Sequence, residues 1–341
     1  MESRQLRALI QGIPKAELHL HIEGSFEPEL MFEIAKRNNV SLDYDSVASL
    51  KEAYTFNNLQ EFLDIYYTGA KVLLHEQDFF DLTWAYLKKV RSQNVIHVEV
   101  FFDPQTHTER GVHFDVVING IYRALEKARK KLNMSFKLIM SYLRHLSEEE
   151  AFKTLESSLP YKHWIDGVGL DSSELGNPPS KFERVFAASA HHGYELVAHA
   201  GEEGPVEYIW EALRLLNVVR IDHGNRCLDD EALVQTLIQQ KIGLTLCPLS
   251  NVELKVISHM SDHPVLKMLD KGLLATIHSD DPAYFGGYMN ENYYETAKAL
   301  NLSMNHIEQL ALNAFEISWL DTGDKELCLA QVRSYFQKFK S

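Results

Sequence analysis

The chain has 341 residues, of which 45% are hydrophobic, and a formal net charge of −14. This length fits one large α/β barrel, which commonly needs about 250 residues, or two average domains. The acidic balance argues against nucleic acid or an anionic membrane as the main partner, because both require a basic surface. The three cysteines are scattered and form no CxxC motif, so neither a disulfide framework nor a thiolate metal site is expected.

The N-terminal stretch MESRQLRALIQGIPK is charged and lacks the apolar core of a secretory signal. The sequence also lacks the run of about 18 apolar residues that a transmembrane helix needs. These observations predict a cytoplasmic protein with no membrane and no nucleic-acid partner. The sequence leaves the oligomeric state open.

Short apolar segments with the composition of buried strands recur along the chain, each followed by a turn and an amphipathic stretch. The eight candidate strands span residues 16–22, 95–102, 137–143, 166–172, 195–201, 218–224, 242–248 and 273–279. Intervening stretches such as EYIWEALRLLN place apolar residues at the i, i+3, i+4 and i+7 spacing of helices. This alternation predicts an α/β protein with the (β/α)8 TIM barrel fold, and a doubly wound open sheet is the alternative.

A helical insert is expected after the first strand, over approximately residues 25–94. The first two candidate strands start 79 residues apart, at 16 and 95, whereas no other successive pair starts more than 42 apart. An insert at this point emerges at the C-terminal mouth of a barrel, where it can cover a pocket. Because no linker, repeat or low-complexity segment occurs, residues 1–341 are expected to form a single domain.

Ionisable residues gather at the C-terminal ends of four candidate strands. The first strand carries HLH, the fifth ends in HAGEEGP, the sixth in DHG and the eighth in HSDDP. In a barrel of this kind the chemistry lies at the C-terminal ends of the strands. An isolated HxH is more typical of two buried histidines without a functional role. Four polar strand ends at the same mouth favour a functional site instead.

We predict that three imidazoles and one carboxylate hold a metal ion: His19, His21, His199 and Asp280. Side chains alternate faces along a strand, so His19 and His21 point the same way. Nitrogen and oxygen ligands without a thiolate are typical of catalytic zinc, and ferrous iron also fits them. Binuclear barrels of the amidohydrolase type resemble this pattern but add a carboxylated lysine at the end of strand 4. The corresponding segment DGVGLDSSE has no lysine, so one ion per chain is expected.

Three further side chains at these strand ends suit hydrolysis beside the metal. A divalent ion lowers the pKa of a bound water from about 15.7 towards 7, which yields hydroxide at neutral pH. Glu202 lies three residues beyond His199, close enough to carry protons at the metal. His223 is expected to orient the water, and Asp281 is expected to hydrogen-bond an edge of the substrate.

The other histidines have simpler expected roles. His278 shares a face with Asp280 by alternation and is expected to support the ligands rather than to coordinate the metal. His97, within the second strand, is expected in the core or behind the ligands. Nine more are expected in solvated loops or helices: His107, His113, His145, His163, His191, His192, His259, His263 and His306.

The motifs ELHLHIEG, HAGEEGP, RIDHGNR, LTLCPLSN and HSDDPAYFGGY occur in this order between residues 17 and 288. Together they resemble the motifs of the adenosine/adenine deaminase family. The resemblance implies a (β/α)8 barrel with one zinc ion that removes ammonia hydrolytically from C6 of a purine. It matches the same four residues to the metal ligands. It also implies that Glu202 protonates the purine N1, that His223 assists the attacking water, and that Asp281 binds the ring at N7.

Within that family the motifs look more like the adenine deaminase branch, as in FFDPQTH, GLDSSE and DDPAYFGGY. Adenosine deaminases typically carry HLDG, with the aspartate facing the ribose, where this chain has HIEG and Glu23. The strand 4 loop departs from the DLAG of nucleoside enzymes, and Ser172 is the nearest counterpart of the glycine that contacts the purine. Glu23 and Ser172 are therefore the other expected substrate contacts. The expected reaction converts adenine to hypoxanthine and ammonia in purine salvage.

Three alternatives stay open on the sequence. A deaminase of N6-substituted adenines such as cytokinins could share every motif, and so could a deaminase of adenosine. The third alternative is an inactive metal-binding barrel. Glu202, His223 and Asp281 argue against an inactive barrel, because a purely structural metal ion needs none of them.

Overall fold

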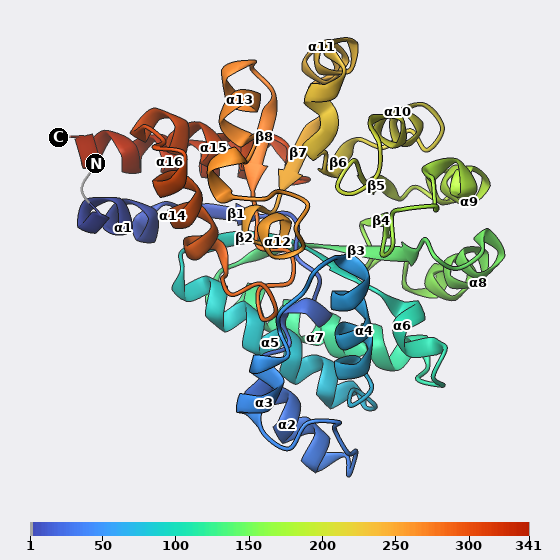
Figure 1. Cartoon of the computed structure of the whole chain (residues 1–341). Coiled ribbons are helices and arrows are strands. Elements are labelled where there is room, and N and C mark those ends of the chain that lie inside the picture. Colours follow the sequence, from blue (N-terminus) through green and yellow to red (C-terminus); the bar gives the residue numbers. More distant parts are fainter. Residues whose placement is uncertain (1–2, 341) are drawn as a thin grey trace.

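The computed structural model describes residues 3–340, so residues 1, 2 and 341 of the expected domain lie outside the described residues (Figure 1). Eight parallel strands form one sheet in chain order, with each strand paired to the next. They are β1 (Lys15–Glu17), β2 (Val95–Phe102), β3 (Ser135–Leu143), β4 (Gly167–Asp171), β5 (Glu195–Ala200), β6 (Arg220–His223), β7 (Gly243–Leu246) and β8 (Leu274–Ile277). The predicted (β/α)8 TIM barrel is confirmed.

Helices surround the strands (Figure 1). Those after β2 are α6 (Pro104–Thr108), α7 (Phe114–Leu132), α8 (Glu148–Ser158), α9 (Glu183–His191), α10 (Val206–Arg214), α11 (Glu231–Gln240), α12 (Pro248–Glu253), α13 (Val265–Asp270), α14 (Met289–Ala299), α15 (Met304–Glu316) and α16 (Thr322–Lys340). Capping residues determine where these helices begin and end, as in α11. Asp230 caps α11 by accepting from the backbone N–H groups of residues 232 and 233, and Lys241 ends this helix in the left-handed conformation.

The first helix, α1 (Ser3–Gly12), lies beside the last one, α16 (Figure 1). The Tyr335 hydroxyl on α16 donates to the Leu9 carbonyl at 2.9 Å and thereby joins the two helices. None of the helices within residues 3–340 is long and apolar enough to cross a membrane.

Between β1 and β2 the chain forms η1 (Glu23–Ser25), α2 (Pro28–Arg37), α3 (Val47–Glu52), α4 (Leu59–Ala70) and α5 (Glu76–Ser92). Asn58 caps α4 by accepting from the Glu61 backbone N–H. The buried face of α4 packs on Leu254, Tyr284 and Phe285, in a hydrophobic cluster separate from the main core. This separate cluster places α4 over the loops after β7 and β8.

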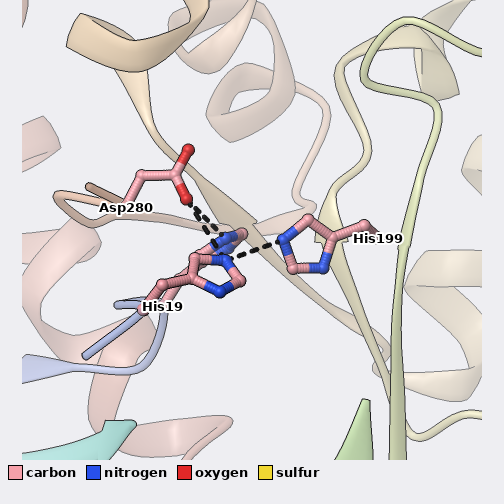
Figure 2. Close-up of side chains that lie close together, drawn as sticks. His19, His199 and Asp280 are labelled. Atoms are coloured by element: carbon pink, nitrogen blue, oxygen red, sulfur yellow. Dashed lines mark hydrogen bonds and ion pairs between the residues drawn. The ribbon is translucent and has the colours of Figure 1, made fainter. Parts of the chain in front are cut away.

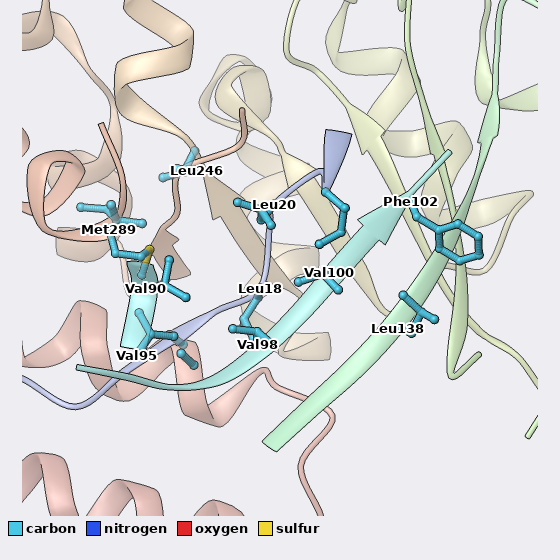
Figure 3. Packing of buried hydrophobic residues seen from close by; sticks show 14 of the residues in the cluster. Leu18, Leu20, Val90, Val95, Val98, Val100, Phe102, Leu138, Leu246 and Met289 are labelled. Atoms are coloured by element: carbon cyan, nitrogen blue, oxygen red, sulfur yellow. The ribbon is translucent and has the colours of Figure 1, made fainter. Parts of the chain in front are cut away.

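The main hydrophobic core lies between the strands and the surrounding helices. Leu18 and Leu20 are fully buried in this core beside Val98 and Val100 of β2 (Figure 3). Leucines and histidines alternate from Leu18 to His21, so the imidazoles lie on the opposite side, toward the barrel interior. Local alternation therefore sends two polar rings inward while their neighbours fill the core.

The first strand is shorter than the predicted 16–22, because regular pairing ends at Glu17. Beyond it, single bridges join Leu20 to Asp280 and His21 to Phe101. The Asp280 N–H donates to the His19 carbonyl at 3.0 Å, and the His21 N–H donates to the Asp280 carbonyl at 3.1 Å. The backbone contacts between the first and last strand segments thus lie at the predicted metal ligands themselves.

Candidate functional site

The four predicted metal ligands converge at the C-terminal mouth of the barrel. One ligand atom from each of His19, His21, His199 and Asp280 lies within 4.8 Å of the others. His19 Nε2 is 3.1 Å from Asp280 Oδ1, and His21 Nε2 is 3.2 Å from His199 Nε2 (Figure 2). All four side chains are buried. Such a set of nitrogen and oxygen donors could hold a metal ion.

A further group stands behind each ligand imidazole on its Nδ1 side. His19 Nδ1 is 2.9 Å from Thr245 Oγ1. His21 Nδ1 is 3.4 Å from Asp171 Oδ2, and His199 Nδ1 is 3.6 Å from Asp222 Oδ2. A partner on Nδ1 sets the tautomer that leaves Nε2 free to coordinate, which is the arrangement usual behind metal-binding histidines. No motif predicted that Asp171, Asp222 and Thr245 would be partners of the ligand histidines, although each lies on a strand beside a ligand.

The backbone at the strand ends is in an uncommon conformation. Ser172, His223 and Asp280 have φ values of +75°, +63° and +63°, in the left-handed region that residues other than glycine rarely adopt. Such strain is held by the surrounding structure and is common at functional sites. Here it turns the chain sharply just after β4 and at the ends of β6 and β8.

Glu202 lies beside His223 at the edge of the ligand cluster. Its Oε2 is 3.4 Å from His223 Nε2, and its Oε1 accepts from Asn251 Nδ2 at 3.4 Å. Burial, followed by the negative charge of Asp280, raises the pKa of Glu202 well above its usual value. Burial also lowers the pKa of His223 to about 3. Burial therefore favours the protonated form of the Glu202 carboxyl group and the neutral form of the His223 imidazole.

Asp281 points into the same space and is 5% exposed. Its Oδ1 is buried and has no hydrogen-bond partner among the described residues. A Cβ atom on Gly24 would lie 1.8 Å from this oxygen, so only glycine leaves room for the carboxyl group. An unpaired buried carboxyl oxygen is costly, which indicates that a ligand group satisfies it.

A cavity joins these groups. Its wall includes five side chains of α4: Leu59, Phe62, Leu63, Tyr66 and Tyr67. His21, His199, Glu202, His223, Asp280, Asp281 and Ser172 line the rest, together with Asp103, Asp171 and Leu254. Within the expected insert, α4 is thus the helix that covers the mouth.

The two remaining predicted substrate contacts occupy different positions. Ser172 lines the cavity, and its Oγ lies 2.9 Å from the Tyr67 hydroxyl and 2.8 Å from His145 Nδ1. Glu23 is buried but is not among the described residues that line the cavity. Its Oε1 lies 2.8 Å from His107 Nε2, and its Oε2 has no partner among the described residues.

A pair of buried carboxyl groups in the cavity wall was not predicted. Asp103 and Asp171 both lie beside His21, and the Tyr66 hydroxyl of α4 donates to Asp103 Oδ2 at 3.0 Å. Burial, followed by the charge of Asp103, raises the pKa of Asp171 well above its usual value. The motifs FFDPQTH and GLDSSE contain these residues, but nothing in their local pattern distinguishes a wall residue from a loop residue.

Two of the histidines expected in solvated positions are buried instead. His107 is fully buried against Glu23, and His263 is 2% exposed beside Asn251. The prediction for these two was wrong, because the packing of one short segment under another is not recognisable from its own sequence. His278 is also buried, and its Nδ1 accepts from the Leu18 N–H at 3.1 Å, next to the ligand His19.

Comparison with known proteins identifies the family of this chain. A family model described as adenosine deaminase matches residues 14–335. The chain belongs to this family. The resemblance inferred from the motifs is therefore confirmed. Membership also explains why the ionisable residues share one end of the barrel.

Individual relatives match nearly the whole chain. An adenine deaminase from Hahella chejuensis is 59% identical over 332 residues, which cover 97% of this chain and 99% of that protein. An adenine deaminase from Acinetobacter baylyi is 58% identical over 95% of this chain and 98% of its own length. The crystal structure of adenine deaminase from Arthrobacter aurescens has a TM-score of 0.94 and 45% identity, covering 96% of this chain and 100% of that one.

Proposed function

We propose that this chain is an adenine aminohydrolase, which converts adenine and water to hypoxanthine and ammonia. The observation that carries the proposal is the meeting in one cavity of a candidate metal-ligand cluster, a buried carboxyl group with a raised pKa and an unpaired carboxyl oxygen. The adenine deaminase relatives, at up to 59% identity over nearly the whole chain, support the same substrate. A purine metabolic role in salvage follows from that reaction.

The four converging residues fit one divalent metal ion. Buried His19 Nε2 makes no hydrogen bond among the described residues, although it lies 3.1 Å from Asp280 Oδ1, another predicted ligand. A metal ion would satisfy both atoms. We propose zinc, held by His19, His21, His199 and Asp280, with ferrous iron as the other ion that suits these donors. When bound there, the ion would supply a nucleophilic water at neutral pH, because it lowers the pKa of water that it binds.

The proton donor in this proposal is Glu202. As water adds to C6, the Glu202 carboxyl group donates its proton to the purine N1. One of the two water protons then passes to the amino group, so that the C6–N6 bond breaks with release of ammonia, and the other returns to Glu202. Asn251 Nδ2 lies 3.4 Å from His223 Nδ1 and donates to it, so the neutral imidazole keeps its proton on Nε2. His223 Nε2–H is then free to orient the attacking water and to stabilise the negative charge that develops on it.

The remaining residues of the cavity contact the edges of the purine ring in this proposal. We propose that the Asp281 carboxyl group, whose pKa burial and the charge of Asp280 raise well above its usual value, donates a hydrogen bond to N7 of the ring. We also propose that Ser172 contacts the ring from the strand 4 loop. Glu23 does not line the cavity but lies behind its wall beside His107, so we propose that it disfavours a ribose from there rather than by direct contact. These contacts recognise a base through its own nitrogen atoms and leave no provision for a sugar.

The proposal treats residues 1–341 as a single domain, in which the helical insert over about 25–94 forms the roof of the site. A cytoplasmic location and the absence of nucleic-acid and membrane partners stay predictions from the sequence. The substrate is a small purine, and the oligomeric state is open.

Purified metal-loaded protein tests the function directly. Incubation with adenine is expected to release one ammonia for each hypoxanthine formed, followed by a coupled ammonia assay and by chromatography of the purines. Absence of turnover on adenine, adenosine and N6-substituted adenines would identify an inactive metal-binding barrel and refute the proposal. If only an N6-substituted adenine or only adenosine is turned over, that purine is the substrate and the assignment of adenine is wrong.

A further inference from the structure

Glu174, in the loop after β4, holds the backbone of the loop that carries Glu202. Its Oε1 accepts from the Gly201 N–H at 2.7 Å. Its Oε2 accepts from the N–H groups of Glu202 at 3.1 Å, Glu203 at 2.8 Å and Gly204 at 2.7 Å. Glu174 is 1% exposed, and it is not among the described residues that line the cavity.

Four successive N–H groups around one carboxylate form an anion-binding concavity of the kind that backbone amides make for phosphates. Hydrogen bonds to a carboxylate are about twice as strong as neutral ones. Here the anion is a side chain of the protein itself. It therefore fixes the path of residues 201–204, and with it the direction in which the Glu202 side chain leaves the backbone.

The glycines of the HAGEEGP motif are required by this concavity. Gly201 has φ +71°, which residues with a side chain rarely adopt. A Cβ atom on Gly204 would lie 2.6 Å from Glu174 Oε1 and 2.6 Å from Tyr208. The two glycines are thus the first and last of the four residues whose N–H groups bind the Glu174 carboxylate.

Glu174 also joins two walls of the cavity. Its own loop begins with Asp171 and Ser172, which line the cavity, and the loop that it holds begins after His199. Buried Arg144 makes a parallel connection, because its Nη1 donates to the His199 carbonyl at 2.7 Å and its Nε donates to the Asn177 carbonyl at 2.9 Å. Two buried side chains, Glu174 and Arg144, therefore connect the β4 and β5 loops.

We propose that Glu174 is a positioning residue that aligns Glu202 with the purine bound against the β4 loop. The inference rests on the proposed function, in which Glu202 is the proton donor. A misplacement of about 1 Å in a reacting group can cost 10²-fold in rate. Loss of the carboxylate therefore lowers kcat, whereas the metal ligands and the substrate contacts keep their own supports.

The variant Glu174→Gln tests this assignment in the metal-loaded full chain. Glutamine keeps one acceptor oxygen, but its NH2 group faces backbone N–H groups that need an acceptor. We expect kcat on adenine to fall about 10- to 100-fold, with KM within about threefold and the metal content unchanged. The matched control is Glu148→Gln on α8, a buried carboxylate that accepts from the Val185 N–H of α9 at 3.0 Å and is not among the described residues that line the cavity. Its kcat is expected to stay near that of the parent.

Gly204→Ala perturbs the same contact from the opposite loop and is expected to give the same split between kcat and KM. The proposal is overturned if both folded variants keep kcat within about threefold of the parent, or if their activity returns on adding excess metal. Failure of both variants to fold would assign Glu174 to folding and also overturn it. If the parent deaminates another purine, the proposed function fails. The ratio of the kcat of the variants to the kcat of the parent, measured on that purine, then still tests the role of Glu174.

Discussion

Replacement of Glu202 by glutamine probes the proposed proton transfer with little change in shape. Glutamine has the size of glutamate and keeps an Oε1 that can accept from Asn251 Nδ2. It removes the proton that burial and the charge of Asp280 hold on the carboxyl group. Because Glu202 does not belong to the four-residue ligand cluster, the variant should bind metal as the parent does.

The expected loss follows from the scale of general acid catalysis. A positioned proton donor contributes typically about 10²- to 10⁴-fold to the rate. This range corresponds to about 2.7–5.4 kcal/mol of transition-state stabilisation, at about 1.36 kcal/mol for each tenfold change. We therefore expect kcat for adenine to fall at least about 10²-fold in Glu202→Gln. KM should change far less, because the ring keeps its contacts with Asp281 and Ser172.

The assay compares steady-state ammonia release with metal content measured on the same sample. Glu203→Gln is the control, because Glu203 is adjacent and half-buried but is not among the described residues that line the cavity. Turnover of Glu202→Gln within a few fold of the parent would remove Glu202 from the mechanism. A parallel loss of metal would show that Glu202 acts on the metal site instead.

Four further outcomes follow from the same geometry. Elemental analysis is expected to give about one divalent ion per chain, and Asp280→Ala is expected to lose both metal and activity; two ions per parent chain, or a fully loaded variant, would contradict the ligand set. Asp222→Asn should weaken metal binding about 10- to 100-fold in a chelator competition, since His199 Nδ1 loses a carboxylate partner, and unchanged affinity would count against this support. The kcat/KM for adenine should fall as pH rises through the raised pKa of Glu202, because only the protonated carboxyl group donates; a profile without this alkaline limb would exclude Glu202 as the acid. Glu23→Asp should gain activity on adenosine, and no gain would remove Glu23 from substrate selection without affecting the reaction.

The barrel and the ligand cluster could be predicted because both depend on regular patterns. Period-2 alternation placed His19 and His21 on one face, and the C-terminal strand ends of a barrel meet at one mouth. The regular part of β1 nevertheless ends at Glu17, since single bridges through Leu20 and His21 replace continuous pairing where the strand bends into the site. A composition-based boundary does not detect such a bend.

The side chains that support the site could not be predicted, because they join loops that are far apart in the sequence. Glu174 lies 27 or more residues from the N–H groups that it binds, and His107 lies 84 residues from Glu23. Such contacts depend on how loops pack on one another, which no local period encodes. The glycines of HAGEEGP were visible in the sequence, but their reason becomes evident only with the Glu174 carboxylate between them.

The central claim, a deaminase that acts on the free base, is tested most directly by kcat/KM values for adenine, adenosine and N6-methyladenine with one preparation of metal-loaded protein. The account predicts that adenine exceeds adenosine by at least about 10²-fold, beyond what a single methylene difference in a pocket provides. Comparable values for adenine and adenosine, or a higher value for N6-methyladenine than for adenine, would contradict it.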